Sequence, residues 1–335
     1  MKKKGLFALV LSGMMLMGNA ISAGAVYESS EEIAFAIRPV DVAENCLYDG
    51  TGYEKTIYIN QEDIQEGETL HFSVFIEAET QQMDIVELLI ETSSEKVTFD
   101  ADTFVKPTAN YYTSSQTFTL PDGTEFSTTL KPYSLGSVGM NKVYSTNCMF
   151  SNGFNETQAA FSMNLMLMPG ANHAFLGGQS DLFSFLDLDV KLSPDIEVGT
   201  YRIDFAEPTE EKKNPNYVSL DIADHSAGAN SQYVDTVPVL KGCNICIGKK
   251  GDIDGDGQIS ADDATRILIY SAQSGAGEQA HFSENDSEAE ENFMYSLASI
   301  NGTTPNATDA ANILTYAAML GAGEEPDWNE ITAQN

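Results

Sequence analysis

The stretch DIDGDGQISADD, residues 252–263, has the residue types and spacing of a calcium-binding loop. Carboxylates stand at its positions 1, 3, 5 and 12, and the glycine at position 6 allows a sharp turn. Calcium prefers oxygen ligands, which alternate residues of a tight loop can supply. The sequence therefore predicts a Ca2+ site with these ligands: Asp252, Asp254, Asp256, the backbone carbonyl of Gln258, Ser260 through a water molecule, and Asp263.

A helix pattern follows this loop but does not precede it. Residues 243–251 read as a strand that ends in a basic turn bounded by glycines, so they leave no room for an entering helix. Downstream, Ala264, Ile267, Leu268 and Ser271 fall at helical spacing. An EF-hand has a helix on both sides of its loop, so this is half of one.

The loop and helix are duplicated. Residues 260–278 match residues 306–324 at a constant offset of 46, with 11 of 19 positions identical. The second loop lacks acidic residues at positions 3 and 5 and is one residue short by this alignment. Only Asn301 and Asp309 resemble ligands there, so we expect weak calcium binding at the second loop or none.

This tandem half EF-hand, over roughly residues 249–328, resembles the dockerin module of cellulosome proteins. The resemblance implies calcium binding and docking into a cohesin module on a scaffold protein. It also implies the partner-binding residues Ala261, Asp262, Leu268, Ile269 and Gln273 in the first repeat, and Ala307, Thr308, Leu314, Thr315 and Met319 in the second. For Leu268 and Leu314, a place in the module's own core is an equally good interpretation.

The segment between the repeats departs from the family pattern. Residues 279–298 are long and acidic, and Glu288, Glu290 and Glu291 followed by Phe293 and Leu297 predict an additional helix. The family's two-fold binding mode is therefore not expected here, and the first repeat should dominate docking.

Residues 26–248 read as an all-β domain. His71 to Glu77 and Leu182 to Leu192 alternate apolar and polar residues, and turn signals separate many such short runs. The fold class predicted for the chain is therefore mainly β, a cohesin-like or jelly-roll sandwich, followed by a small all-α calcium-binding module at 249–335.

The rhythm of strands in the middle region is also similar to that of a cohesin, with a short strand at Val97–Phe99 and late strands in residues 181–192 and 199–205. This resemblance implies a sandwich that receives a dockerin. A secreted sandwich of another kind, such as a carbohydrate-binding domain, is the alternative. The Tyr111–Tyr112 pair is the candidate stacking surface for a sugar.

The N-terminus and the charge point to an exported protein. Three lysines precede an apolar run and small residues, so residues 1–25 are predicted to be a secretory signal peptide. The net charge of −33 argues against nucleic-acid partners and anionic membranes, and no other stretch reaches the length of a membrane span. We expect a secreted protein, bound to a cellulosome at the cell surface.

The sequence gives little support for a zinc site, a redox site or a catalytic site. Cys243 and Cys246 lie in a strand-like run where residues three apart point to opposite faces, which argues against a zinc or redox site. A disulfide to Cys46 or Cys148 and free thiols both stay open. No pair of carboxylates stands in a recognisable catalytic motif.

These patterns favour a non-catalytic cellulosome component. The dockerin-like module would bind a scaffold cohesin in the presence of calcium, and the sandwich would act as a cohesin-like adaptor, as in a scaffoldin that receives a dockerin-bearing enzyme. A dockerin-bearing carbohydrate-binding protein or a glycoside hydrolase acting on plant polysaccharide is the alternative.

Overall fold

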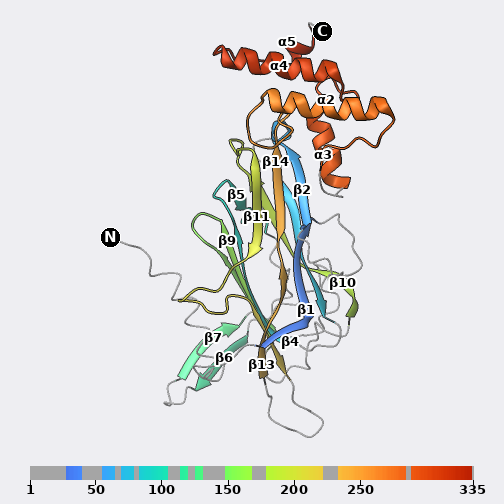
Figure 1. Cartoon of the computed structure of the whole chain (residues 1–335). Helices are drawn as coiled ribbons and strands as arrows, with labels where there is room; N and C mark the ends of the chain where they lie inside the picture. The colour runs from blue at the N-terminus through green and yellow to red at the C-terminus, as the bar shows by residue number, and fades with distance from the viewer. Residues whose placement is uncertain are drawn as a thin grey trace.

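A computed structural model describes residues 28–39, 55–64, 69–78, 83–104, 114–119, 125–130, 148–167, 179–221, 233–283 and 288–333. Within these ranges strands come first and helices follow from residue 261 onward, which agrees with a mainly β domain and a small helical unit. Figure 1 shows the helices at one end of the β-domain and a two-stranded hairpin at the other. The predicted signal peptide, Cys46 and the Tyr111–Tyr112 pair lie outside the described residues.

The β-domain contains a large sheet and one separate hairpin. The strands are β1 (Glu28–Pro39), β2 (Lys55–Asn60), β3 (Thr69–Ala78), β4 (Met83–Thr92), β5 (Val97–Phe99), β6 (Ser114–Thr119), β7 (Glu125–Leu130), β8 (Cys148–Phe154), β9 (Ala160–Leu167), β10 (Gln179–Leu192), β11 (Gly199–Phe205), β12 (Tyr217–Asp221), β13 (Tyr233–Lys241) and β14 (Cys243–Gly248), with a 3-10 turn η1 (Gln61–Asp63) after β2. The separate hairpin is β6–β7.

The large sheet runs in the order β2-β14-β11-β4-β12-β13-β1-β3-β10-β5, and the pair β8–β9 branches from β4. β4 makes this branch because β12 pairs with its first residues, β11 with its last, and β9 along most of its length. Two pairings are parallel, β1 with β13 and β2 with β14, and the others are antiparallel.

One end of the large sheet, β5, meets the β8–β9 branch around a common core. The Phe99 N–H at the end of β5 donates a 2.8 Å hydrogen bond to the carbonyl of Gln158, next to β9, and the Phe99 ring lies 6.3 Å from that of Phe161. The alternating side chains predicted to point inward on β10 are all buried: Leu186, Leu188, Val190 and Leu192. On β14 the same alternation buries Cys243, Ile245 and Ile247.

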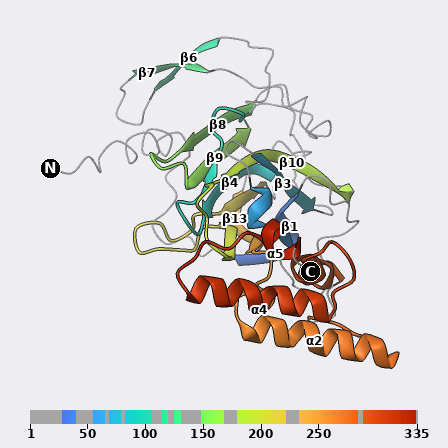
Figure 2. The same ribbon diagram turned by 90° about the horizontal axis from the view of Figure 1, so that it is seen from above.

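The described residues after the β-domain form four helices: α2 (Ala261–Ala276), α3 (Glu288–Ala298), α4 (Ala307–Gly321) and α5 (Trp328–Thr332). The helix predicted between the repeats is confirmed as α3. α2 and α4 pack against each other, and Figure 2 shows them side by side. A second core holds the unit together: Ile253, Ile259, Ala264, Ile267, Phe282, Leu297, Ala298, Ile300, Ala310 and Ile313.

The helical unit is joined to the β-domain through α3. The Phe293 ring lies 5.1 Å from the ring of Tyr58 on β2, and a Cβ on Gly248 at the end of β14 would be 2.5 Å from Phe293 Cζ. The Gly251 N–H donates a 3.0 Å hydrogen bond to the Leu297 carbonyl. The boundary predicted at residues 248 and 249 is therefore a packed junction rather than an extended linker.

Within the described residues, none of the helices has the length and apolar character needed to cross a membrane. Cys243 is buried and Cys246 is half-buried. Burial raises the pKa of the Cys246 thiol, whereas a reactive cysteine has a lowered pKa.

Candidate metal loop and docking face

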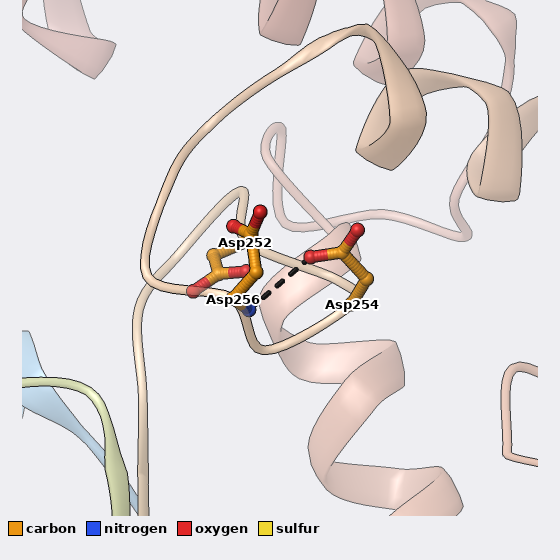
Figure 3. A group of neighbouring side chains, drawn as sticks. All are labelled: Asp252, Asp254 and Asp256. Atoms are coloured by element: carbon orange, nitrogen blue, oxygen red, sulfur yellow. Dashed lines mark hydrogen bonds between the residues drawn. The ribbon is translucent and has the colours of Figure 1, made fainter.

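Three of the predicted ligands come together in the first loop. Carboxylate oxygens of Asp252, Asp254 and Asp256 all lie within 4.8 Å of one another, and Figure 3 shows the three side chains gathered around the turn. The Asp256 N–H donates a 3.2 Å hydrogen bond to Asp254 Oδ1 (Figure 3). Asp252 is buried and Asp256 is exposed, so the cluster opens from the protein interior to solvent.

Two glycines let the chain turn around these carboxylates. Gly255 and Gly257 have φ angles of 73° and 84°, in the left-handed region that favours glycine. Their N–H groups donate 2.9 Å hydrogen bonds to Asp252, one to each carboxylate oxygen. The sharp turn predicted at position 6 of the loop is confirmed at Gly257.

Asp263 closes the loop from its other end. Its Oδ1 accepts hydrogen bonds from the N–H groups of Ile253 at 2.6 Å and Asp254 at 3.2 Å, and its Oδ2 accepts from Ser260 N–H at 2.8 Å. Asp263 does not belong to the three-carboxylate cluster. The position predicted as the last ligand therefore already holds both ends of the loop together.

Ser260, predicted to reach calcium through water, begins helix α2. Its side chain accepts a 3.1 Å hydrogen bond from Asp262 N–H, and with Asp263 it forms a reciprocal capping box. The loop and the first turn of α2 are thus one hydrogen-bonded unit, so a change in the loop reaches the helix directly. Gln258, expected to contribute its carbonyl, lies exposed between the cluster and Ser260.

The electrostatics of the loop favour a cation. Burial, together with the charges of Asp263 and Asp254, raises the pKa of Asp252 to about 6 against the lowering effect of the two glycine N–H bonds. Burial also raises the pKa of Asp263. Among the described residues, no lysine or arginine pairs with the cluster. A calcium ion would supply the missing positive charge with ligands of the type it prefers.

The residues predicted to bind a partner lie largely on the surface of α2 and α4. Leu268, Ile269 and Leu314 are 46%, 53% and 46% exposed, so the alternative that Leu268 and Leu314 form the core is wrong. The core positions are their neighbours Ile267 and Ile313. Other predicted contact residues are also exposed: Ala261, Asp262, Ala307, Thr308 and Thr315.

Gln273 and Met319 are half-buried, and so present less surface than predicted. Leu320, which was not predicted, is 51% exposed. Its equivalent in the first repeat is Ser274, so a comparison of the two repeats does not predict an apolar contact residue at this position. We define the docking face as the exposed apolar residues of α2 and α4, namely Leu268, Ile269, Leu314 and Leu320.

Comparison with known proteins gives structural neighbours only. No family model and no curated protein matches the chain. A cohesin–dockerin complex from Clostridium thermocellum, Coh-OlpC-Doc435, contains a chain with 9% identity and a TM-score of 0.33, over 68% of this chain and 99% of that one.

Two further neighbours are cohesins. The seventh ScaB type I cohesin of Pseudobacteroides cellulosolvens has 7% identity and a TM-score of 0.35, over 66% of this chain and 94% of that one. A type III cohesin from the ScaE scaffoldin of Ruminococcus flavefaciens has 10% identity and a TM-score of 0.34, over 65% and 89%. These scores are too low to assign the chain to a family.

Proposed function

We propose that this protein is a non-catalytic, exported component of a cellulosome-like assembly, and that its helical unit docks to a cohesin module when calcium is bound. The observation that carries the proposal is the first loop, where three carboxylates gather within 4.8 Å directly before a helix with exposed apolar residues. Loop and helix share the capping box of Ser260 and Asp263, so the metal site and the docking face are mechanically joined.

Calcium would act on the protein by removing repulsion. Asp252, Asp254 and Asp256 would hold the ion, with the Gln258 carbonyl and water completing the shell, and Asp263 on its edge. Without a cation, ionised Asp252 is buried next to other carboxylates, which destabilises the folded loop. Bound calcium stabilises the loop, and through Ser260 it stabilises the start of α2.

The docking face would then bind by burial of apolar surface. Leu268 and Ile269 on α2 and Leu314 and Leu320 on α4 are each about half exposed. Burial of the exposed part of each side chain contributes on the order of 1 kcal/mol. Four such residues on two packed helices suit a protein partner with an apolar surface.

For the β-domain we propose the role of a cohesin-like adaptor that receives a dockerin. Support comes from the strand rhythm of residues 67–248 and from the union of this domain with a dockerin-like unit in one chain. Such a chain would convert one docking specificity into another. A polysaccharide ligand for the same domain is the competing function.

The first experiment measures binding of the full chain to a panel of cohesin modules by isothermal titration calorimetry, with calcium and with excess chelator. We expect a saturable complex only with calcium. Asp252→Ala should weaken calcium binding on the order of 100-fold and weaken docking with it. Glu156→Ala, which removes an exposed carboxylate from a turn of the β-domain, is the control and should change neither. Docking that persists with chelator would refute calcium control.

A second set of titrations tests the β-domain with the same full chain. Binding of a dockerin that is unaffected by Asp252→Ala would support the adaptor role, because that variant removes only the chain's own docking. Retention on insoluble cellulose or xylan without dockerin binding would replace the adaptor by a carbohydrate-binding protein. Release of reducing sugar would make the protein a hydrolase.

A further inference from the structure

The second loop has the same hydrogen-bonded frame as the first. Asp309, which is fully buried, accepts a 3.0 Å hydrogen bond at Oδ1 from Asn301 N–H and a 2.9 Å hydrogen bond at Oδ2 from Asn306 N–H. Asn306 begins α4 with a capping box, as Ser260 begins α2. The last acidic position of each loop therefore performs the same structural task.

The shared frame aligns the two loops more accurately than the repeat offset does. Asp263 is bonded to N–H groups 10, 9 and 3 residues before it, and Asp309 to N–H groups 8 and 3 residues before it. Ile253 and Ile300 both lie in the core of the helical unit, and Gly255 and Gly302 have similar left-handed φ angles of 73° and 70°, so Asn301 corresponds to Asp254. The second loop is therefore one residue shorter, as the sequence alignment indicated, and Ser299 stands in the place of Asp252.

Ser299 has a hydroxyl group but no charge, and this hydroxyl donates a 2.9 Å hydrogen bond to the Tyr295 carbonyl. The first loop has a buried carboxylate at this place, whereas the second has an uncharged side chain. The shortened turn also contains no acidic residue between Asn301 and Asp309. The residues present in the second loop do not fit a calcium ion.

A side-chain amide takes part in the second loop instead. Asn312 is fully buried on α4, one turn after Asp309, and its Nδ2 lies 3.3 Å from Asn301 Oδ1. A buried amide is costly unless it is hydrogen-bonded, so this contact fixes the loop against the helix. The equivalent residue of the first repeat, 46 positions earlier, is the exposed Arg266.

We propose that the second loop is held closed by Asp309 and Asn312 without any metal ion, so that calcium controls only half of the docking face. This inference rests on the proposed calcium site of the first loop. Calcium orders the first loop and α2, with Leu268 and Ile269. α4 keeps Leu314 and Leu320 in place without calcium, because its loop is closed by hydrogen bonds and its Tyr316 stacks on Trp328 at 4.3 Å.

Calcium titration of the full chain, read by calorimetry, gives the number of sites. We expect one equivalent, lost in Asp252→Ala and kept in Asp309→Asn. Two equivalents would overturn this inference and leave the proposed function standing. The absence of any calcium binding would overturn both.

Hydrogen exchange followed by mass spectrometry tests the two halves separately. With chelator, residues 261–276 should exchange at least tenfold faster, while residues 307–321 keep their protection. Equal loss of protection in both helices would overturn the inference.

The variant Asn312→Ala tests the amide itself, with Arg266→Ala as the matched control from the first repeat. In the presence of calcium, Asn312→Ala should speed exchange across residues 301–309, and Arg266→Ala should leave both loops unchanged. If Asn312→Ala abolished folding, Asn312→Ser would replace it, since a smaller polar side chain weakens the same contact. Unchanged exchange in the variant would show that the amide does not hold the loop.

Discussion

At the scale of single residues, Asp252 would make the proposed calcium binding depend on pH. Its pKa is raised to about 6, above the ordinary value of 3.8, chiefly by burial. Calcium needs the ionised carboxylate, so protons compete with it as the pH falls through 6. We expect calcium affinity to be roughly tenfold weaker at pH 5 than at pH 7.5, by calorimetry.

The calcium-free protein should respond to pH in the opposite direction. Because the folded pKa of Asp252 lies above the unfolded value, protonation favours the folded loop. Chelated protein should therefore become more stable to heat as the pH falls from 7 toward 5. In chelator, the melting temperature could instead fall as the pH falls from 7 toward 5, with no change caused by Asp252→Asn. That outcome would contradict the claim that protonation of Asp252 stabilises the calcium-free loop.

In the β-domain, Asp100 has a lowered pKa, in contrast to the raised pKa of Asp252. Burial alone would raise its pKa, but hydrogen bonds from Lys191 Nζ at 2.7 Å and Asp102 N–H lower it below the usual value. Its contribution to stability is therefore present above pH 4 and lost as the pH falls below it. Asp100→Asn should destabilise the domain by about 1 to 2 kcal/mol at pH 7, measured by urea unfolding.

The matched control for Asp100 is the pair of Lys96 and Asp195. The Asp195 side chain is 71% exposed, whereas that of Asp100 is 4% exposed. Exposed ion pairs contribute little, so Asp195→Asn should change the free energy of unfolding far less than Asp100→Asn does. Equal effects of the two substitutions would mean that burial does not determine how much the ion pair of Lys191 and Asp100 contributes to the free energy of unfolding.

At the same scale, the sequence located the cluster of three carboxylates but not the residues that support the loops. The spacing of aspartates located Asp252, Asp254 and Asp256, since ligand chemistry requires that spacing locally. Asn312 gave no such signal, because its importance depends on a contact 11 residues away with Asn301. Asp263 was expected to be a ligand. The structure shows that it also accepts hydrogen bonds from three backbone N–H groups, which the sequence did not predict.

At the scale of elements, the docking face divides between α2 and α4. Leu268→Asp and Leu314→Asp should each weaken cohesin binding on the order of tenfold or more, because each introduces a charge into the buried interface. Neither should lower the melting temperature much, since both side chains are about half exposed. Ser274→Asp is a control at an exposed site on α2 and should leave binding unchanged.

The sequence predicted most of the strands and helices, but it did not predict which strands pair with each other. Alternation gave β10 and β14 with their inward residues, because that pattern depends only on burial of one face. The parallel pairings of β1 with β13 and β2 with β14 join segments far apart in the chain. Local patterns do not encode such register, and α5 was missed because its five residues show no periodicity.

At the scale of the whole molecule, α3 fixes the position of the helical unit on the β-domain. This helix lies between the two repeats, and Figure 1 shows it between α2 and the end of β2. Its Phe293 and Leu297 lie over Gly248, where a Cβ would be 2.5 Å from the former and 2.8 Å from the latter. Only glycine allows this close approach between helix and strand end.

A double-mutant cycle tests whether this junction is a fixed contact. Gly248→Ala alone should cost about 1 to 3 kcal/mol by overpacking, and Phe293→Ala alone should cost about 2 kcal/mol by loss of aromatic burial. In the double variant the alanine methyl occupies space left by the ring, so the combined loss should be smaller than the sum by about 1 kcal/mol or more. Urea unfolding of the full chain with saturating calcium measures all three. Strictly additive losses would mean that α3 does not rest on the end of β14.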